Sequence, residues 1–153
     1  MPDNQRVVVA HESRNGLVGL YDAKTGDLIR EFAGHTGTVR CVEVSEDGKR
    51  MLTGADDRSV RLWDIDSGQC IHEFLGHADG IIGVQFVRGS GLVRSISWDR
   101  TAITWDAKTS KPLSYVDFGS LAIDFAQALT PDGTRLVVCE TSGSMTVWTL
   151  PTN

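Results

Sequence analysis

The chain has 153 residues, enough for one domain of ordinary size, and its 41% apolar and 23% charged residues are the balance of a globular protein. Its net charge of −5 argues against a nucleic acid or an anionic membrane as the main partner, because phosphate binding needs a basic surface. No apolar run approaches the roughly 20 residues of a membrane span. The opening MPDNQR predicts no secretory signal, because it lacks an apolar core.

In chain order, short apolar runs alternate with turn signals. The clearest runs are rich in Val, Ile, Leu and aromatic residues: VRCVEV (39–44), RMLTGA (50–55), SVRLWDI (59–65) and CIHEF (70–74). The turns contain Asp-Gly, or they open on Asp before a Gly or Ser: SEDGK (45–49) and TPDGT (130–134), then DAKTGD (22–27), DIDSGQ (64–69) and DAKTSK (106–111). Such runs between such turns are typical of β-strands, and no stretch shows helical periodicity. We therefore predict an all-β chain.

The same features return at a fixed period. A Gly-His pair and a Trp-Asp pair each recur 42 residues later: Gly34-His35 as Gly76-His77, and Trp63-Asp64 as Trp105-Asp106. Tyr21 lies 42 residues before Trp63, and Trp148 lies 43 residues after Trp105. Periods of about 40–45 residues belong to propellers built from four-stranded blades. The sequence therefore predicts β-propeller blades of antiparallel strands within a single domain, residues 1–153.

Four repeat units cover the chain, at about residues 6–33, 34–75, 76–118 and 119–150. With the strands of a unit called a to d, they read bcd, abcd, abcd and abc, or fourteen strands in about 3.5–4 blades. The first unit lacks strand a and the last lacks strand d, so we predict an open or incomplete ring. Three interpretations follow, in this order: a fragment of a longer propeller, a subunit that completes a propeller by assembling with itself or with another chain, and a strained four-bladed disc.

Two sets of four residues recur at identical spacing in the full units: His35, Thr53, Asp57 and Trp63, then His77, Ser95, Asp99 and Trp105. A hydroxyl, an imidazole and a carboxylate together are also the parts of a hydrolase site, so an enzyme using these groups is one hypothesis. A set repeated in successive units favours a scaffold instead. One histidine per unit also argues against a metal site. We therefore expect no enzyme, no catalytic residue, no metal and no cofactor.

The segments GH…TGADDRSVRLWD and GH…SISWDRTAITWD resemble the WD-repeat (Trp-Asp repeat) β-propeller family, and the resemblance covers about residues 6–150. In that family the four residues form a structural tetrad. The resemblance implies that the indole of Trp63 donates to Thr53, that Thr53 bonds to His35, and that His35 bonds to Asp57. The second set is expected to repeat these bonds. The physical reason is that a buried Trp N–H, His and Asp each need partners.

The two outer units depart from this pattern. Counting 42 or 43 residues along the chain puts these residues in the tetrad positions: His11, Asn15 and Tyr21 in the first unit, and Ser120, Val138, Ser142 and Trp148 in the last. Atypical terminal units are usual in repeat proteins. We expect both to be less tightly clamped, and the last, with Gly119-Ser120 in place of Gly-His, to be the loosest.

WD-repeat proteins are generally scaffolds that bind proteins or peptides on the face formed by their d–a and b–c loops. Transferred by position, this face includes Trp98, Arg40, Asp56, Thr38, Ile82 and Arg14. Trp98 is the sharpest candidate, because an exposed aromatic at a loop tip is a typical interface anchor; the alternative is that it packs on a neighbouring blade. Arg40 and Asp56 form either a recognition pair or, as we favour, an ordinary surface ion pair.

The remaining charged and sulfur-containing residues support a non-catalytic reading. Lys49, Arg50, Arg58 and Arg61 are expected to be solvated surface rather than a nucleic-acid site. His72 is expected to be a half-exposed strand residue. The three cysteines, Cys41, Cys70 and Cys139, stand far apart, which predicts reduced, buried thiols. We expect a cytoplasmic protein, or a nuclear one if the source is eukaryotic, with no membrane partner.

Overall fold

The computed structural model describes residues 5–11, 16–119, 123–130, 132–140 and 143–151, except for the side chains of residues 123–129, 139 and 140. Over these residues it contains fourteen strands and no helix. The first sheet holds β1 (Arg6–Ala10), β2 (Val18–Asp22) and β3 (Leu28–Phe32). The second holds β4 (Val39–Val44), β5 (Arg50–Ala55), β6 (Ser59–Asp64) and β7 (Cys70–Leu75). The third holds β8 (Ile81–Val87), β9 (Leu92–Ser97), β10 (Thr101–Asp106) and β11 (Pro112–Asp117), and the fourth holds β12 (Ile123–Leu129), β13 (Arg135–Glu140) and β14 (Met145–Thr149).

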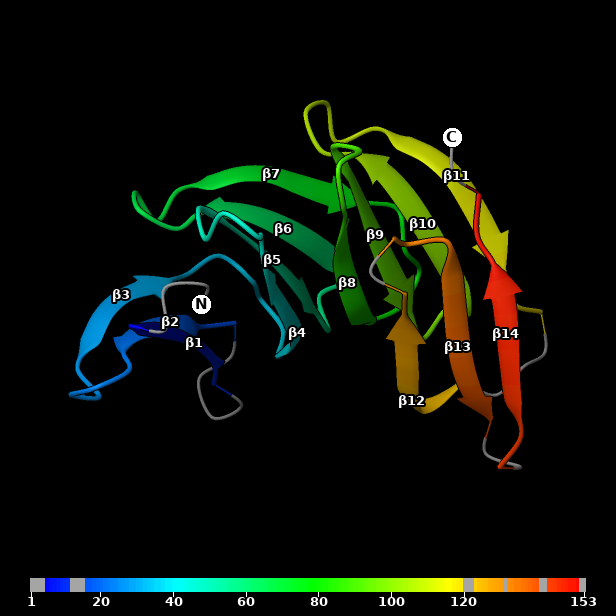
Figure 1. Cartoon of the computed structure of the whole chain (residues 1–153), viewed down its shortest axis with the longest axis horizontal. Helices are drawn as coiled ribbons and strands as arrows, with labels where there is room; N and C mark the ends of the chain where they lie inside the picture. Colours follow the sequence, from blue (N-terminus) through cyan, green and yellow to red (C-terminus); the bar gives the residue numbers. More distant parts are fainter. Residues whose placement is uncertain (1–4, 12–15, 120–122, 131, 141–142, 152–153) are drawn as a thin grey trace.

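Each sheet is an antiparallel meander in chain order, which is the arrangement of a propeller blade. Figure 1 shows the four blades side by side in an open arc, with β1–β3 at one end and β12–β14 at the other. The predicted all-β fold with 3, 4, 4 and 3 strands is therefore confirmed, and the sheets do not close into a ring.

Aspartate-capped turns explain why strands c and d of successive blades begin and end at equivalent residues. Oδ1 of Asp22 accepts the backbone N–H groups of Lys24 and Thr25 at 2.8 and 2.9 Å. Asp106 caps the equivalent turn of the third blade in the same way, and in the second blade Asp64 accepts the backbone N–H and the hydroxyl of Ser67. A carboxylate that accepts backbone N–H groups two and three residues ahead stabilises a turn without help from the core. The short side chain of Asp is therefore what each Trp-Asp or Tyr-Asp pair contributes locally.

The hydrophobic core lies between blades. We call the face of a blade toward the next blade in the chain its leading face, and the opposite face its trailing face. In the second blade, Leu52, Val60 and Leu62 form the leading face and pack against Val93 and Trp105 of the third blade. On the opposite side, Met51 and Trp63 belong to the trailing face and pack against the first blade. Because residues alternate between the faces along each strand, each blade is stabilised by its neighbours.

An aromatic contact accompanies each blade interface. A Phe within one residue of the end of strand d meets the Trp of the next blade. The ring centroids of the three pairs lie 5.3–5.8 Å apart: Phe32 with Trp63, Phe74 with Trp105, and Phe118 with Trp148. These are favourable edge-on or tilted geometries that add to the burial of the rings. Strand d therefore contributes to the contact with the following blade as well as completing its own sheet.

The interface between the third and fourth blades is partly polar. Arg94 and Thr104 stand where the second blade has Leu52 and Leu62, because both pairs lie directly opposite each other across strands b and c. The buried Arg94 guanidinium donates through Nε to Thr104 Oγ1 at 3.1 Å and through Nη2 to the carbonyl of Pro151. Burial lowers the pKa of Arg94. This side chain joins the third blade to Pro151, two residues past the last strand.

Strand pairing corrects the alignment of the first blade. Val7 pairs with Tyr21 as Met51 pairs with Trp63, so Val9, and not His11, occupies the place of Thr53. Counting 42 residues was wrong on this strand. Residues 11–17 separate the last paired residues of β1 and β2, whereas only residues 55–59 separate those of β5 and β6, so the first connection is two residues longer. His11 instead bonds through Nε2 to the Tyr21 hydroxyl at 2.6 Å. Asn15, Ser120 and Ser142 lie outside the described residues.

Candidate functional site

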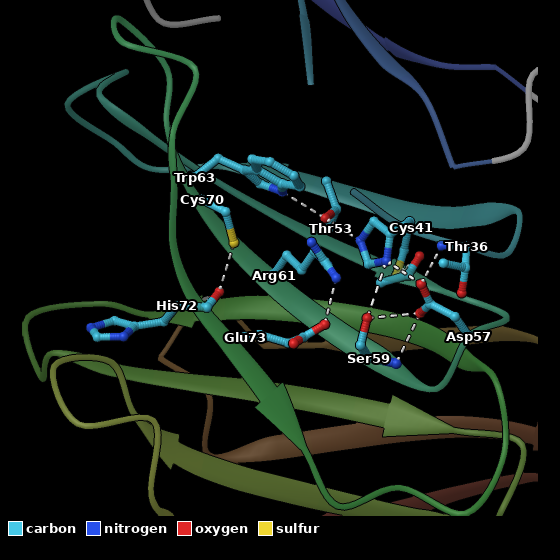
Figure 2. A network of polar contacts seen from close by, with 12 residues as sticks. Thr36, Cys41, Thr53, Asp57, Ser59, Arg61, Trp63, Cys70, His72 and Glu73 are labelled. Atoms are coloured by element: carbon cyan, nitrogen blue, oxygen red, sulfur yellow. Dashed lines mark hydrogen bonds and ion pairs between the residues drawn. The ribbon is translucent and has the colours of Figure 1, made fainter. Parts of the chain in front are cut away.

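The structure brings the first set of four residues together in one chain of hydrogen bonds. Trp63 Nε1 donates to Thr53 Oγ1 at 2.8 Å, and Thr53 in turn donates to His35 Nε2 at 2.7 Å. His35 Nδ1 donates to Asp57 Oδ2 at 2.9 Å. Figure 2 shows Trp63, Thr53 and Asp57 in this network. The bonds tie strand c to strand b, to the loop before strand a, and to the turn between strands b and c.

The second set repeats this geometry in the third blade. Trp105 Nε1 donates to Ser95 Oγ at 2.8 Å, Ser95 lies 2.8 Å from His77 Nε2, and His77 Nδ1 lies 2.9 Å from Asp99 Oδ2. A serine replaces the threonine without changing the distances, because only the hydroxyl oxygen is used. The two networks are separate, one in each full blade.

Each network has a fifth member that the sequence analysis missed. Ser59 Oγ donates to Asp57 Oδ1 at 2.7 Å and lies 3.2 Å from His35 Nδ1. Thr101 makes the same two contacts with Asp99 and His77, at 2.7 and 3.1 Å. The signal was present, since a hydroxyl residue follows the aspartate by two positions in both full repeats, as DRS and DRT.

Burial and hydrogen bonding set the charges of these groups. Desolvation lowers the pKa of His35 and of His77, against the opposing effect of the aspartate that each one bonds. Burial opposes ionisation of Asp57, but hydrogen bonds from Ser59, the Thr36 amide and His35 outweigh it and hold the Asp57 pKa below its usual value. The histidine is therefore neutral at pH 7 with its proton on Nδ1, and the aspartate is charged.

This arrangement suits a clamp and does not suit nucleophilic chemistry. Thr53 and Ser95 are fully buried, and each hydroxyl is occupied by an indole on one side and an imidazole on the other. A nucleophile must reach its substrate, and a buried hydroxyl that already makes two hydrogen bonds cannot do so. In the described part of the chain, no group of three His, Cys, Asp or Glu side chains could hold a metal ion.

Three of the predicted face residues lie near one another where the second and third blades adjoin. Arg40 binds Asp56 through two bonds, Nε to Oδ1 at 2.9 Å and Nη2 to Oδ2 at 2.7 Å. Gly80 separates this pair from Trp98: a Cβ placed on Gly80 would lie 3.1 Å from Asp56 Oδ1 and 3.5 Å from Trp98 Cδ1. We call Arg40, Asp56 and Trp98 the rim cluster. The side chains of Arg40 and Asp56 are 48% and 34% exposed, and Trp98 is half-buried.

The other predicted face residues lie differently. Thr38 supports the rim cluster through its backbone, because its carbonyl accepts the N–H of Asp56 at 2.9 Å. Ile82 packs against the apolar cluster between the third and fourth blades. Arg14 and Thr141 lie outside the described residues.

Two expectations about other side chains were wrong. Cys70 is exposed on strand β7, whereas the Cys41 thiol is buried, which raises its pKa to about 12. The error for Cys70 arises because strand d is the outer edge of its blade. Arg61 is not free surface: it pairs with Glu73 at 2.6 Å and is only 19% exposed. His72 is half-exposed on β7, as predicted.

A link between blades was also missed. The Glu43 carboxylate on β4 accepts the backbone N–H of Phe86 on β8 at 2.6 Å, and burial raises the pKa of Glu43. It therefore satisfies one edge N–H group of the neighbouring blade's innermost strand.

Over the described residues, no helix is long and apolar enough to cross a membrane.

Comparison with known proteins finds similarity to a family model and to several individual proteins. The family described as WD domain, G-beta repeat, matches residues 26–64 and 68–106. The intraflagellar transport protein 122 homolog of Danio rerio is 41% identical over 59 residues, which are 39% of this chain and 5% of that protein. Actin-interacting protein 1 of Drosophila melanogaster is 23% identical over 97% of this chain and 25% of its own length. Protein groucho of Drosophila melanogaster is 38% identical over 47 residues, 31% of this chain and 6% of its own length. The chain thus spans a quarter or less of these relatives.

Proposed function

The chain belongs to the WD-repeat family, and on that premise we propose that it is a non-enzymatic scaffold that binds a protein or peptide partner at its rim cluster. The family is generally one of non-enzymatic scaffolds. One similar protein is named for its interaction with actin, which is a protein partner. The fold alone names no partner, so the proposal rests on the site.

The observation that carries the proposal is the meeting of two blades at the rim cluster. A half-buried Trp98 gives a rigid apolar contact, and the adjacent Arg40 and Asp56 present charged groups whose geometry is already fixed. An aromatic anchor beside ordered polar groups is the usual composition of a binding hot spot. The two-bond geometry supports the recognition-pair alternative over the favoured ordinary surface ion pair, since Arg40 and Asp56 form a defined pair beside Trp98.

The test is selection of short peptides from a displayed random library on the purified chain, followed by affinity measurement with rim variants. We expect Trp98→Ala to weaken a selected peptide at least about tenfold and Arg40→Ala to weaken it by a smaller factor. Leu113→Ala is the matched control, because Leu113 is 49% exposed on the outer strand β11. Thermal unfolding of each variant separates lost binding from lost folding.

The opposite pattern would count against the rim cluster. Selected peptides that bind Trp98→Ala and Arg40→Ala as tightly as they bind the unaltered chain would place the binding surface elsewhere.

The open arc leaves its end faces for further blades, either of a longer chain or of another chain. A cytoplasmic location is part of the same proposal.

A further inference from the structure

The leading face of the fourth blade exposes positions that every other blade buries. Strand c carries two of these positions per blade. In the first three blades they are 7% exposed or less: Val18 and Leu20, Val60 and Leu62, Ala102 and Thr104. The register of strands b and c makes Met145 and Val147 their equivalents, and these are 73% and 59% exposed. Val137, directly opposite Val147, extends the same apolar face.

The trailing face of the first blade shows the converse. The strand b position on which a preceding blade packs is held by Met51 in the second blade and Val93 in the third, and both are 0% exposed. The first blade has Val7 at this position, at 43% exposed. Val9, two residues along on the same face, is 39% exposed. Tyr21, in the place of the tetrad Trp, completes this face and is partly exposed.

The two ends of the arc are therefore the two halves of an interface that the chain already makes three times. Leading-face residues pack on trailing-face residues in each internal contact, as Leu62 does with Trp105. We propose that the leading face of the fourth blade docks on the trailing face of the first blade of a second copy of this chain. This inference concerns assembly and does not rest on the rim cluster.

The number of blades is compatible with a closed pair. A head-to-tail interface closes into a ring when its rotations sum to a full turn, and otherwise gives a filament. Two copies of this four-blade arc supply eight blades, which lies within the range of about four to eight blades in known propellers. Each chain would then supply half of the ring. The two interfaces between copies, which we call joints, would be identical.

The joints between copies are expected to be weaker than the joints within a chain. At each one, the fourth blade has no described strand beyond β14, and the first blade has none before β1. Within the described residues, such a joint holds no counterpart of the Phe74–Trp105 ring contact. A dimer that dissociates on dilution follows.

The experiment is light scattering coupled to size-exclusion chromatography of the 153-residue chain over a range of concentrations. We expect a single species of twice 16.7 kDa that dissociates on dilution. Val147→Lys and Val9→Asp should each raise the dissociation constant at least about 100-fold, because each buries an unpaired charge in both joints. Leu113→Lys changes an apolar residue whose exposure of 49% lies between those of Val9 and Val147, away from both faces, and should leave the dissociation constant unchanged. Far-UV circular dichroism confirms that each variant keeps its strands.

Mixing the two charged variants gives the decisive result. A head-to-tail pair made of one Val147→Lys chain and one Val9→Asp chain has one unaltered joint and one joint with opposite charges. The mixture should therefore associate at concentrations where neither variant does alone. A symmetric contact through one face would leave the other variant dimeric, and that result overturns the proposal. Three other results would also overturn the proposal: a monomer at every concentration, a species that grows without limit, and a mixture of the two variants that stays monomeric. A monomer at every concentration would assign the end faces to other blades.

Discussion

The second and fourth blades share the same antiparallel order of strands a, b and c, but they differ in how the tryptophan of strand c is held. Trp63 is 2% exposed and donates its indole N–H to Thr53. Trp148 keeps a ring contact with Phe118 at 5.3 Å, yet Val138 stands where Thr53 does. Among the described residues, the buried Nε1 of Trp148 has no hydrogen-bond partner.

The difference separates two roles that are combined in a complete blade. Strand pairing and ring packing are sufficient to form a sheet and seat it against its neighbour, as the fourth blade shows. The hydrogen-bond chain adds a tie between the sheet and the loop that precedes it. A buried donor without a partner costs roughly 1–3 kcal/mol, so the fourth blade is held less firmly for the same packing.

The largest expected effect comes from removing a tryptophan that has both roles. Trp105→Ala should lower the free energy of unfolding by about 3–5 kcal/mol, because it empties the core between two blades and leaves Ser95 without its donor. Trp148→Ala should cost clearly less, because Trp148 is only half-buried and its N–H is already unpaired. Urea unfolding followed by circular dichroism measures both. Equal losses would mean that the hydrogen-bond chain contributes little.

The next effect isolates the hydrogen-bond chain from the packing. His35→Ala should lower the free energy of unfolding by about 1–3 kcal/mol, because Thr53 and Asp57 each lose a buried partner. His72→Ala is the matched control: His72 is a half-exposed histidine of the same blade and should cost less than about 0.5 kcal/mol. An unchanged stability of the His35 variant would contradict a clamping role.

The repeat was readable from sequence because its markers are local. Trp-Asp pairs and Asp-capped turns recur at a fixed spacing, and each depends on only a few neighbouring residues. The register of β1 was not readable, because Val7, Val8 and Val9 are chemically alike and no marker chooses between them. Only the backbone pairing with Tyr21 settles it.

The candidate site divides in the same way. The four-residue sets follow from spacing within a blade, and even the missed Ser59 and Thr101 follow from it. The direction of Ile82 and the contact of Asp56 with Gly80 depend on how the next blade is seated, which no short motif encodes. Sequence therefore identifies groups within blades more reliably than groups between blades.

Acid provides a milder way to disturb both complete blades together. Burial lowers the pKa values of His35 and His77, so the unfolded chain binds more protons than the folded chain below about pH 6.5. The free energy of unfolding should therefore fall as the pH drops through this range. Below about pH 4, protonation of Asp57 and Asp99, whose pKa values are also lowered, should extend the loss.

Urea unfolding between pH 8 and pH 5 (roughly the range in which an ordinary histidine titrates) measures this slope. The double variant His35→Gln/His77→Gln should be less stable throughout but should show a flatter dependence on pH. Glu43 has the opposite effect on the pH dependence of stability. Burial raises its pKa, so its contribution to the free energy of unfolding is lost as the pH rises. A slope that is unchanged in the double variant would assign the acid sensitivity to other groups.

The smallest expected effect comes from giving the fourth blade the hydroxyl that it lacks. Val138→Thr places an oxygen where Thr53 bonds Trp63, so it should supply an acceptor for Trp148 and raise the free energy of unfolding by up to about 1 kcal/mol. The reciprocal change, Thr53→Val, should cost about 1–3 kcal/mol, because it leaves the Trp63 indole N–H and His35 Nε2 without a partner. The two changes are chemically opposite at equivalent positions, so their unequal sizes measure what the histidine adds. If they were equal and opposite, the indole bond alone would account for the clamp.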